Sequence, residues 1–160
     1  MRITTKVNID TSVWKDVVKN IKTHQHDRMR YGWFDSVHSS GFPTAQIAKW
    51  NEEGHKTGGG GISPPRPMIR VGAAPKVEKL VGETVRNSLT RIVLGDSDWK
   101  EELERIGQGA EKILKKEIED WTTPPNRPLT IKLKGFNDPL IDTGQMLDQV
   151  TYRVGRLNEL

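Results

Sequence analysis

The sequence has no cysteine among its 160 residues. This absence excludes disulfide bonds, thiolate zinc sites and a cysteine nucleophile, and it suits a protein made in a reducing cytoplasm. No apolar run approaches the roughly 18 residues that a membrane-spanning helix needs, so we expect no membrane segment. The start of the chain alternates polar and apolar residues, which is not the pattern of a signal peptide.

A strong charge of one sign is also lacking. Lys and Arg total 25 against 21 Asp and Glu, and the resulting net charge of +4 is spread along the chain without a basic run. A solvated surface explains this pattern better than a nucleic-acid face, which stays as the alternative. Hydrophobic residues make up 34% and charged residues 29%, which suits a single polar globular domain over residues 1–160.

Hydrophobic periodicity predicts the elements of the N-terminal part. Alternation over residues 2–9 indicates a strand, and a polar residue among 10–12 can cap the apolar-faced helix that follows. A polar break at 24–28 separates this helix from an aromatic-rich stretch, 29–37, which predicts a second strand.

A short helix, "TAQIAKWNEEG", is predicted from Thr44 to the residue before Gly54, because glycine ends helices at low conformational cost. Residues 55–63 contain four consecutive glycines and predict a flexible, mobile loop. The "PPRP" segment, 64–67, is predicted to be extended, since each proline disfavours a helical conformation in the residue before it.

The strongest periodicity covers residues 77–93 and then 99–118, where apolar residues recur at spacings of three and four. Gly95 interrupts the pattern. The sequence therefore predicts either two helices, the second capped by Asp96 or Ser97, or one long helix with a kink.

Alternation predicts a strand over 129–133 and a last strand over 150–154. Between them, Asp142 or Thr143 can cap a short helix, with Gln145 placed for a capping-box contact to Asp142. The expected fold class is α+β: an antiparallel sheet packed by a long or kinked helix, with a mobile glycine-rich loop.

Catalytic patterns are missing. In "HKTGGGG", Lys56 and Thr57 precede the glycines and prolines follow them, whereas a phosphate loop needs the lysine after the glycines at the start of a helix. His24 and His26 have no further ligands at metal-binding spacing. No G-x-S-x-G pattern occurs, and capping explains the Asp96 and Asp98 pair. We expect no catalytic residue, no cofactor and no metal.

The "PPRP" segment has the composition of a polyproline ligand, but Met68 and Ile69 follow at once, which favours a stiff segment that enters the core with Arg66 free for an ion pair. Five tryptophans could stack on nucleic-acid bases. Because four of them fall on predicted apolar faces, packing in the core or at a subunit interface is favoured. They are Trp14, Trp33, Trp50, Trp99 and Trp121.

Three segments combine in a fixed order: "IAKWNEEG" (47–54), "ISPPRPMIR" (62–70) and "PLIDTGQMLDQVTYRV" (139–154). This set resembles the neck and tail-completion proteins of long-tailed bacteriophages and prophages, which include the virion-morphogenesis proteins of Mu-like phages and the minor tail proteins similar to lambda's protein Z. That family shows a helix ending in Asn-Glu-x-Gly, a variable loop, Pro-x-Arg-Pro, a long helix and Pro-Leu-x-Asp-Thr-Gly. The resemblance covers residues 29–156 and leaves 1–28 as an N-terminal strand and helix.

The resemblance implies a structural virion protein and not an enzyme. It implies a homo-oligomeric ring, a hexamer or dodecamer, at the head–tail junction or tail top, in contact with the connector, the tail terminator or the tail tube. Weak contact with DNA in the lumen fits such a ring, and assembly would take place in the bacterial cytoplasm. Trp50 and Glu53 depart from the family pattern, which often has other apolar residues at these positions.

The positions that carry the motif are the candidate interface residues. A purely structural role is the competing interpretation for each, since they also stand where helices end, are capped or pack closely. The candidates are Trp50, Asn51, Glu52, Gly54, Pro65, Arg66, Pro67, Asp142, Thr143 and Gly144.

Overall fold

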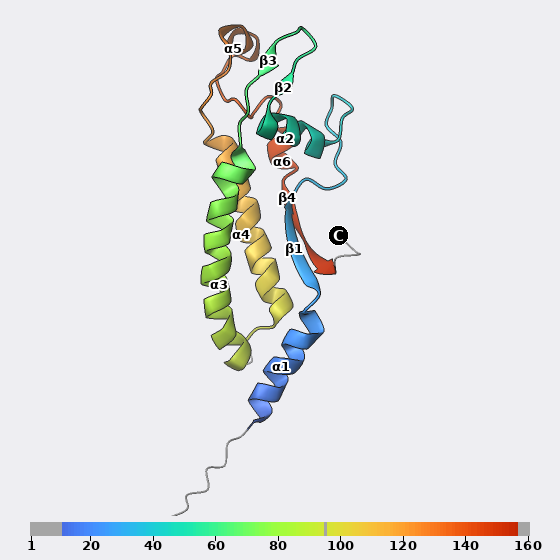
Figure 1. Cartoon of the computed structure of the whole chain (residues 1–160), viewed down its shortest axis with the longest axis vertical. Coiled ribbons are helices and arrows are strands. Elements are labelled where there is room, and N and C mark those ends of the chain that lie inside the picture. Colours follow the sequence, from blue (N-terminus) through green and yellow to red (C-terminus); the bar gives the residue numbers. More distant parts are fainter. Residues whose placement is uncertain (1–10, 95, 157–160) are drawn as a thin grey trace, which may run out of the picture.

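A computed structural model of the chain describes residues 11–94 and 96–156 and shows an elongated molecule built around two long helices (Figure 1). The predicted strand over residues 2–9 lies outside the described residues. The α+β prediction is confirmed. The long helical element is two antiparallel helices, α3 (Ala74–Leu94) and α4 (Trp99–Glu119), rather than one kinked helix.

Asp98 caps α4, instead of the predicted Asp96 or Ser97. Its side chain accepts a hydrogen bond from the Glu101 amide at 2.9 Å, and the Glu101 carboxylate accepts one from the Asp98 amide at 3.3 Å. This reciprocal pair satisfies two backbone donors at the helix start and places negative charge at the positive end of the helix dipole.

Helix α4 is the central element of the fold, because it packs against α3, against the main sheet and against the segment before α3. Its buried stripe comprises Ile106, Ala110, Leu114 and Ile118, spaced by four residues. Gly107 allows the closest approach: a Cβ atom there would lie 2.2 Å from Cδ2 of Tyr152. The main sheet therefore sits almost against the α4 backbone.

The main sheet has two described strands, β1 (Asp27–Gly32) and β4 (Thr151–Arg156), which pair antiparallel. The predicted strand over 29–37 starts two residues earlier and ends at Gly32. Gly32 adopts a φ of 136° and Asp35 a φ of 43°, conformations that turn the chain away from the sheet.

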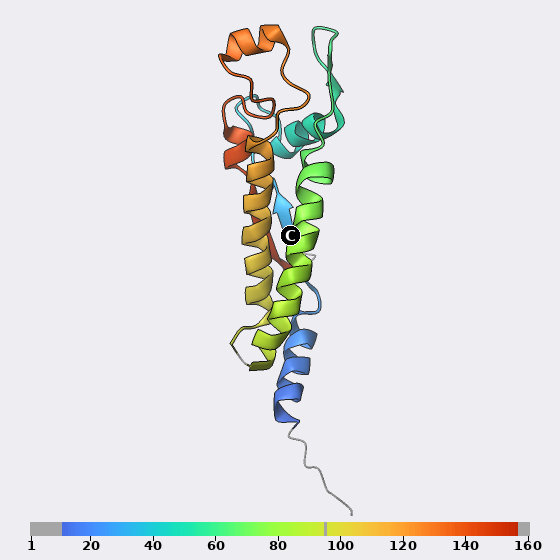
Figure 2. The same cartoon turned by 90° about the vertical axis from the view of Figure 1, so that its left-hand side faces the viewer.

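Helix α1 (Ser12–His24) extends below α3 and α4, as both views show (Figure 1, Figure 2). Thr11 is the N-cap residue, but its side chain makes no capping hydrogen bond. Val17 is buried, whereas Trp14 is 64% exposed. The prediction of an apolar face thus holds, but only part of that face is covered.

Short elements form the opposite end. Helix α2 (Thr44–Glu53) ends at Gly54 as predicted. Residues 55–63 are not an irregular loop, because β2 (His55–Lys56) pairs with β3 (Ile62–Ser63) in a hairpin whose turn contains the glycines. The mobility of this hairpin stays a prediction.

The predicted strand over 129–133 is wrong, since this segment forms α5 (Pro128–Lys134). Pro128 stands in the first turn, where its fixed φ favours a helix and its missing N–H costs nothing. Leu129 and Leu133 share an exposed side of the helix, so their spacing of four reflects a helix rather than strand alternation.

The remaining elements complete the core. A π-helical turn, η1 (Met68–Ala73), leads directly into α3, and α6 (Gln145–Asp148) precedes β4. The buried core cluster lies where these elements meet the C-terminal half of α4. It comprises Ala48, Met68, Ala73, Leu114, Ile118, Leu140, Met146 and Val150.

Candidate functional site

The three motif segments, far apart in the sequence, meet at one end of the molecule, which we call the motif end and define as α2, the β2–β3 hairpin, α5 and α6 (Figure 1). Asn51 joins all three. Its carbonyl accepts a hydrogen bond from the Arg66 amide at 2.7 Å, and its side-chain amide lies 4.0 Å from the sulfur of Met146. The segment order noted in the sequence thus corresponds to one contiguous structural unit.

Glu52 belongs to α2 but caps the start of another helix, η1. Its two carboxylate oxygens accept hydrogen bonds from the backbone amides of Ile69 and Arg70, each at 2.9 Å. These amides belong to the first turn of η1, whose donors have no partner within the helix. A carboxylate at this position also interacts favourably with the helix dipole. The role of Glu52 is therefore structural: it locks α2 to the start of the long helix.

Gly54 is required by both conformation and space. Its φ is 75° and its ψ is 160°, so it has a positive φ but not the left-handed helical conformation expected from its place after a helix. A Cβ atom here would lie 2.8 Å from the Ser63 carbonyl oxygen and 2.9 Å from the Pro65 nitrogen. Glycine therefore allows the extended proline segment to pass directly over the end of α2.

Trp50 is half-buried in a small aromatic group. Its ring packs edge-on against Phe42, with ring centroids 5.1 Å apart, and lies 5.8 Å from the ring of His55. The His55 ring also lies within hydrogen-bonding distance, 3.2 Å, of the Trp50 carbonyl oxygen. Trp50 thus anchors the hairpin to α2.

In the proline segment, Pro65 is exposed and Pro67 stands immediately before η1. The prediction that Arg66 is free for an ion pair is wrong, because its side chain is buried and reaches residues 124–126. Its guanidinium donates to the Pro124 carbonyl at 3.3 Å and to the Asn126 side chain at 3.4 Å. Burial lowers the pKa of Arg66.

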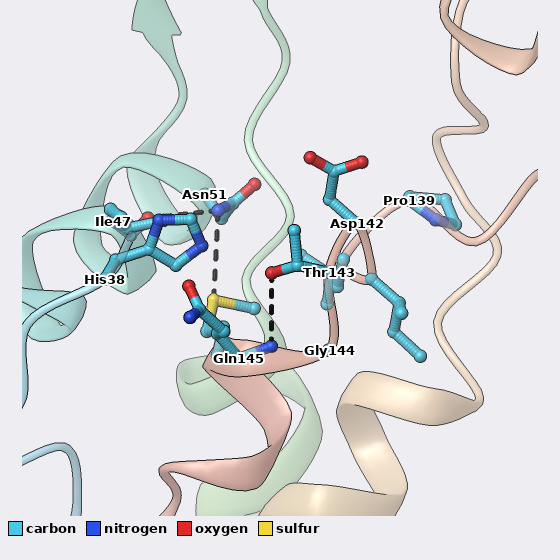
Figure 3. A pocket seen from close by; sticks show the side chains of 11 residues that line it. His38, Ile47, Asn51, Pro139, Asp142, Thr143, Gly144 and Gln145 are labelled. Atoms are coloured by element: carbon cyan, nitrogen blue, oxygen red, sulfur yellow. Dashed lines mark hydrogen bonds between the residues drawn. The ribbon is translucent and has the colours of Figure 1, made fainter. Parts of the chain in front are cut away.

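The Asp-Thr-Gly motif lines one side of a cavity of about 170 Å³ between α2 and α6 (Figure 3). Gly144, with a φ of 82°, is the N-cap residue of α6, in place of the predicted Asp142 or Thr143. The predicted capping box is absent: Asp142 points away, and the Gln145 side chain accepts a hydrogen bond from the Ser39 amide at 2.9 Å. Thr143 contributes only a long contact, 3.4 Å, to the Gln145 amide.

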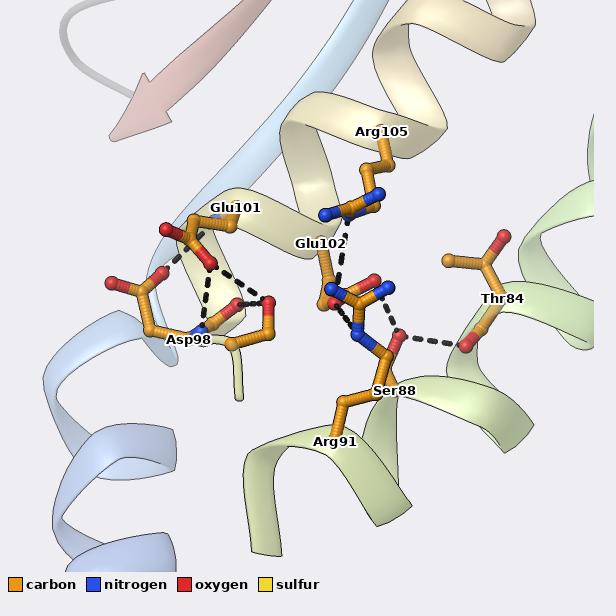
Figure 4. A network of polar contacts seen from close by, with 8 residues as sticks. Thr84, Ser88, Arg91, Asp98, Glu101, Glu102 and Arg105 are labelled. Atoms are coloured by element: carbon orange, nitrogen blue, oxygen red, sulfur yellow. Dashed lines mark hydrogen bonds and ion pairs between the residues drawn. The ribbon is translucent and has the colours of Figure 1, made fainter. Parts of the chain in front are cut away.

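A buried polar network between α3 and α4 was not predicted (Figure 4). Glu102, 3% exposed, receives a hydrogen bond from Ser88 at 3.0 Å and lies 3.3 Å from Arg91 and 3.8 Å from Arg105. Burial, the largest influence, raises the pKa of this carboxyl group. The hydroxyls of Ser97 and Ser88 and the two guanidinium groups lower the pKa, and their combined effect exceeds that of burial. The net shift of the Glu102 pKa is therefore downward.

The sequence offered one signal for this network. Glu102 falls on the same face of α4 as Ile106 and Ala110, at helical spacing, so a carboxylate on an apolar stripe called for a cationic partner. This signal did not indicate which arginine pairs with Glu102, because Arg91 belongs to the other helix, α3.

His24, which the sequence did not favour as a metal ligand, makes a local contact. His24 and Asp27 pair with each other, at 2.6 Å between the ring nitrogen and the carboxylate oxygen. Across residues 11–94 and 96–156, no three potential ligand side chains gather closely enough to hold a metal ion. Within the same ranges, no helix has the length and apolar character needed to cross a membrane.

Comparisons with known proteins returned no matching family model, no matching curated protein and no matching solved structure.

Proposed function

We propose that this protein is a structural virion protein of a tailed phage, which forms a ring at the head–tail junction or tail top and is required for tail completion and head–tail joining. The observation that carries the proposal is the convergence of the three motif segments through Asn51, Arg66 and Met146. Segments that resemble one family and also build one unit support a shared structural role more strongly than scattered matches would. The ring would be a hexamer or dodecamer.

The distribution of exposed apolar side chains supports a ring. A ring with head-to-tail contacts requires two different, complementary surfaces on each subunit. At one end, α1 exposes Trp14; at the other, α5 exposes Leu133, which is 79% accessible. The two ends are separated by the α3–α4 pair, whose 21-residue helices are each roughly 30 Å long.

The role of the motif residues in this proposal is mainly indirect. Glu52, Gly54 and Gly144 fix the backbone of the motif end, while the exposed Pro65, Asp142 and Thr143 are available to neighbouring virion proteins. The neighbours would be the connector, the tail terminator or the tail tube. No part of this role requires a catalytic residue.

Light scattering and negative-stain microscopy test the proposal, on the protein alone and with tail-tube or connector protein added. We expect rings of defined size. Trp14→Lys should weaken them, because a charge would be buried at a subunit contact. Thr90→Lys adds the same charge at an exposed position in α3 and serves as the matched control. A protein that stays monomeric under all conditions and is absent from purified virions contradicts the proposal.

DNA binding is a second candidate, favoured by one observation. On α1, the exposed Trp14 lies in a shallow groove of about 500 Å³ together with Lys15, Lys19 and Lys22. An aromatic ring among cations suits base stacking beside phosphate contacts. Fluorescence anisotropy with single-stranded and duplex DNA tests this, since phosphate contacts make affinity fall steeply with salt. Absence of binding at low salt excludes this second function.

A further inference from the structure

A second cavity, of about 570 Å³, lies at the motif end between the β2–β3 hairpin and the segment that leads into α5. Two prolines, two exposed apolar side chains and several hydrogen-bond donors line it. The lining includes Arg66, Asn126, Arg127, Ile62 and Leu129.

Arg66 brings an unneutralised positive charge to this cavity. Its side chain is 7% exposed, and its hydrogen bonds, at 3.3 and 3.4 Å, go to the neutral oxygens of Pro124 and Asn126. Across the described parts of the chain, Arg66 makes no ion pair with an Asp or Glu. Buried charges are normally paired, because removing a charge from water is costly.

Asn126 contacts the Arg66 guanidinium at the wall of this cavity. The residue is 9% exposed, and its side-chain nitrogen, Nδ2, is buried without a hydrogen-bond partner among the described residues. Its orientation is set by Arg66: the amide oxygen faces the guanidinium, so the NH₂ group must point the other way. Because Nδ2 is itself closed off from solvent, Asn126 serves the cavity by positioning the Arg66 guanidinium rather than by contacting a ligand.

The surroundings are positive and partly apolar. Arg127 lines the same cavity and uses one guanidinium nitrogen on the Ile62 carbonyl, at 3.0 Å. The nearby Lys134 has its pKa lowered first by burial and also by the charge of Arg66, against the opposing effect of Asp142 and Asp138. The side chains of Ile62 and Leu129 are exposed beside these cations.

We propose that this cavity binds a carboxylate group carried on an apolar stem. The planar guanidinium of Arg66 offers a fork of N–H donors that matches a carboxylate, and Arg127, which lines the same cavity, adds a second cation. Ile62 and Leu129 would cover the stem. The site is independent of the proposed ring function. The carboxylate could belong to a free small molecule or to an acidic side chain of another polypeptide.

Isothermal titration calorimetry at constant ionic strength in chloride tests the proposal with four probes: acetate, hexanoate, inorganic phosphate and the peptide N-acetyl-Leu-Glu-Leu-amide. We expect hexanoate to bind roughly tenfold more tightly than acetate, because its methylene groups contact apolar side chains. A peptide that binds more tightly than hexanoate assigns the carboxylate to a polypeptide, and the reverse order assigns it to a free molecule. Tighter binding of phosphate than of any carboxylate, or no binding at all, overturns the proposal.

Variants locate the site. Arg66→Gln should weaken hexanoate binding about tenfold or more, since it removes hydrogen bonds to a charged group. Arg70→Gln removes the same charge from an exposed residue outside the cavity and should leave binding unchanged. Equal losses in both variants would mean that general charge attraction explains binding, which contradicts the proposal.

Because Arg66 is buried, two further measurements separate loss of binding from loss of fold in its variant. Arg127→Gln, at an exposed position, should reduce affinity without loss of fold, as checked by circular dichroism. In the unaltered protein, NMR shifts caused by hexanoate should concentrate in residues 57–66 and 125–130. Shifts concentrated on the lysines of α1 instead would show that the cavity is not the site.

Discussion

The two ends of the molecule are stabilised in different ways. At the motif end, short segments are joined by a few side-chain contacts, such as Glu52 to the first turn of η1, 17 residues further on, and Asn51 to Met146, 95 residues further on. Between the motif end and α1, in the region that we call the helical end, α3 and α4 follow one another in the chain and share long apolar stripes, with one charged network around Glu102. Local sequence thus builds the helical end, whereas long-range contacts build the motif end.

This difference separates stability from recognition. A helix pair tolerates single surface changes, because its packing is spread over many residues. The motif end depends on a few positions where a glycine, a carboxylate or a buried cation has no simple replacement. It also exposes the larger variety of side chains, which suits contact with partners. Three changes, in order of decreasing effect, test this comparison.

The largest effect is expected from Met68→Ala, in the core cluster beside the motif end. Met68 is fully buried in the core cluster, so its removal leaves a cavity and should lower the free energy of unfolding by about 3 kcal/mol. Urea denaturation followed by circular dichroism measures this. Leu89→Ala, on the half-exposed side of α3, is the matched control and should cost less than about 1 kcal/mol. Equal losses would contradict the burial of Met68 in the core cluster.

Gly54→Ala should lower the free energy of unfolding by about 2 kcal/mol, because alanine is strained at this backbone conformation and its Cβ would meet the Ser63 carbonyl. The same urea titration applies. Gly58→Ala places its Cβ in open space in the hairpin turn and should change stability by under about 0.5 kcal/mol. A Gly54→Ala protein as stable as the parent would refute the close approach of the proline segment.

Glu102→Gln should lower the free energy of unfolding by about 1 kcal/mol at neutral pH, since it removes the charge that faces Arg91 and Arg105 from a buried position. The pKa of Glu102 is lowered in the folded protein, so its contribution is complete above the unfolded pKa of roughly 4.3 and is lost as pH falls through the folded value.

Urea titrations of both proteins from pH 3 to pH 7 measure this dependence. The difference between parent and variant should be constant near neutrality and should vanish in acid. Glu83→Gln is the control: its pair with Lys79 is exposed and 3.9 Å long, so its loss should have no measurable effect. A difference independent of pH would mean that Glu102 acts through packing rather than charge.

The sequence predicted the helical end well and the motif end less well. The periodicity of α3 and α4 is dictated by burial along one face, so the pattern located the helical residues, although it left open whether they form two helices or one kinked helix. The strand predicted over 129–133 was wrong, because the spacing of Leu129 and Leu133 fits both a strand and a helix. Pro128, in the first turn, favours the helix. The C-terminal limit of β1 was also not predicted, because it depends on the positive φ of Gly32, which hydrophobic periodicity does not reveal.

For the candidate site, the segments could be named from the sequence but their contacts could not. That Asn51 and Gly54 end a helix follows from local preference. That Glu52 caps a different helix, or that Arg66 reaches Asn126 instead of a carboxylate, depends on how distant segments pack. Of the residues that carry the resemblance, Glu52, Gly54 and Gly144 fix the backbone of the motif end.

The contacts of Asn51 and Glu52 have a consequence for how the chain can change. They fasten residues 51–52 to residues 66–70, so the hairpin between them leaves and returns through a closed stem. Lengthening such an excursion costs only closure entropy, about 0.6 kcal/mol for each doubling of its length. The glycine stretch can therefore accept inserted residues: a longer or different sequence can replace it while α2 and α3 keep their positions.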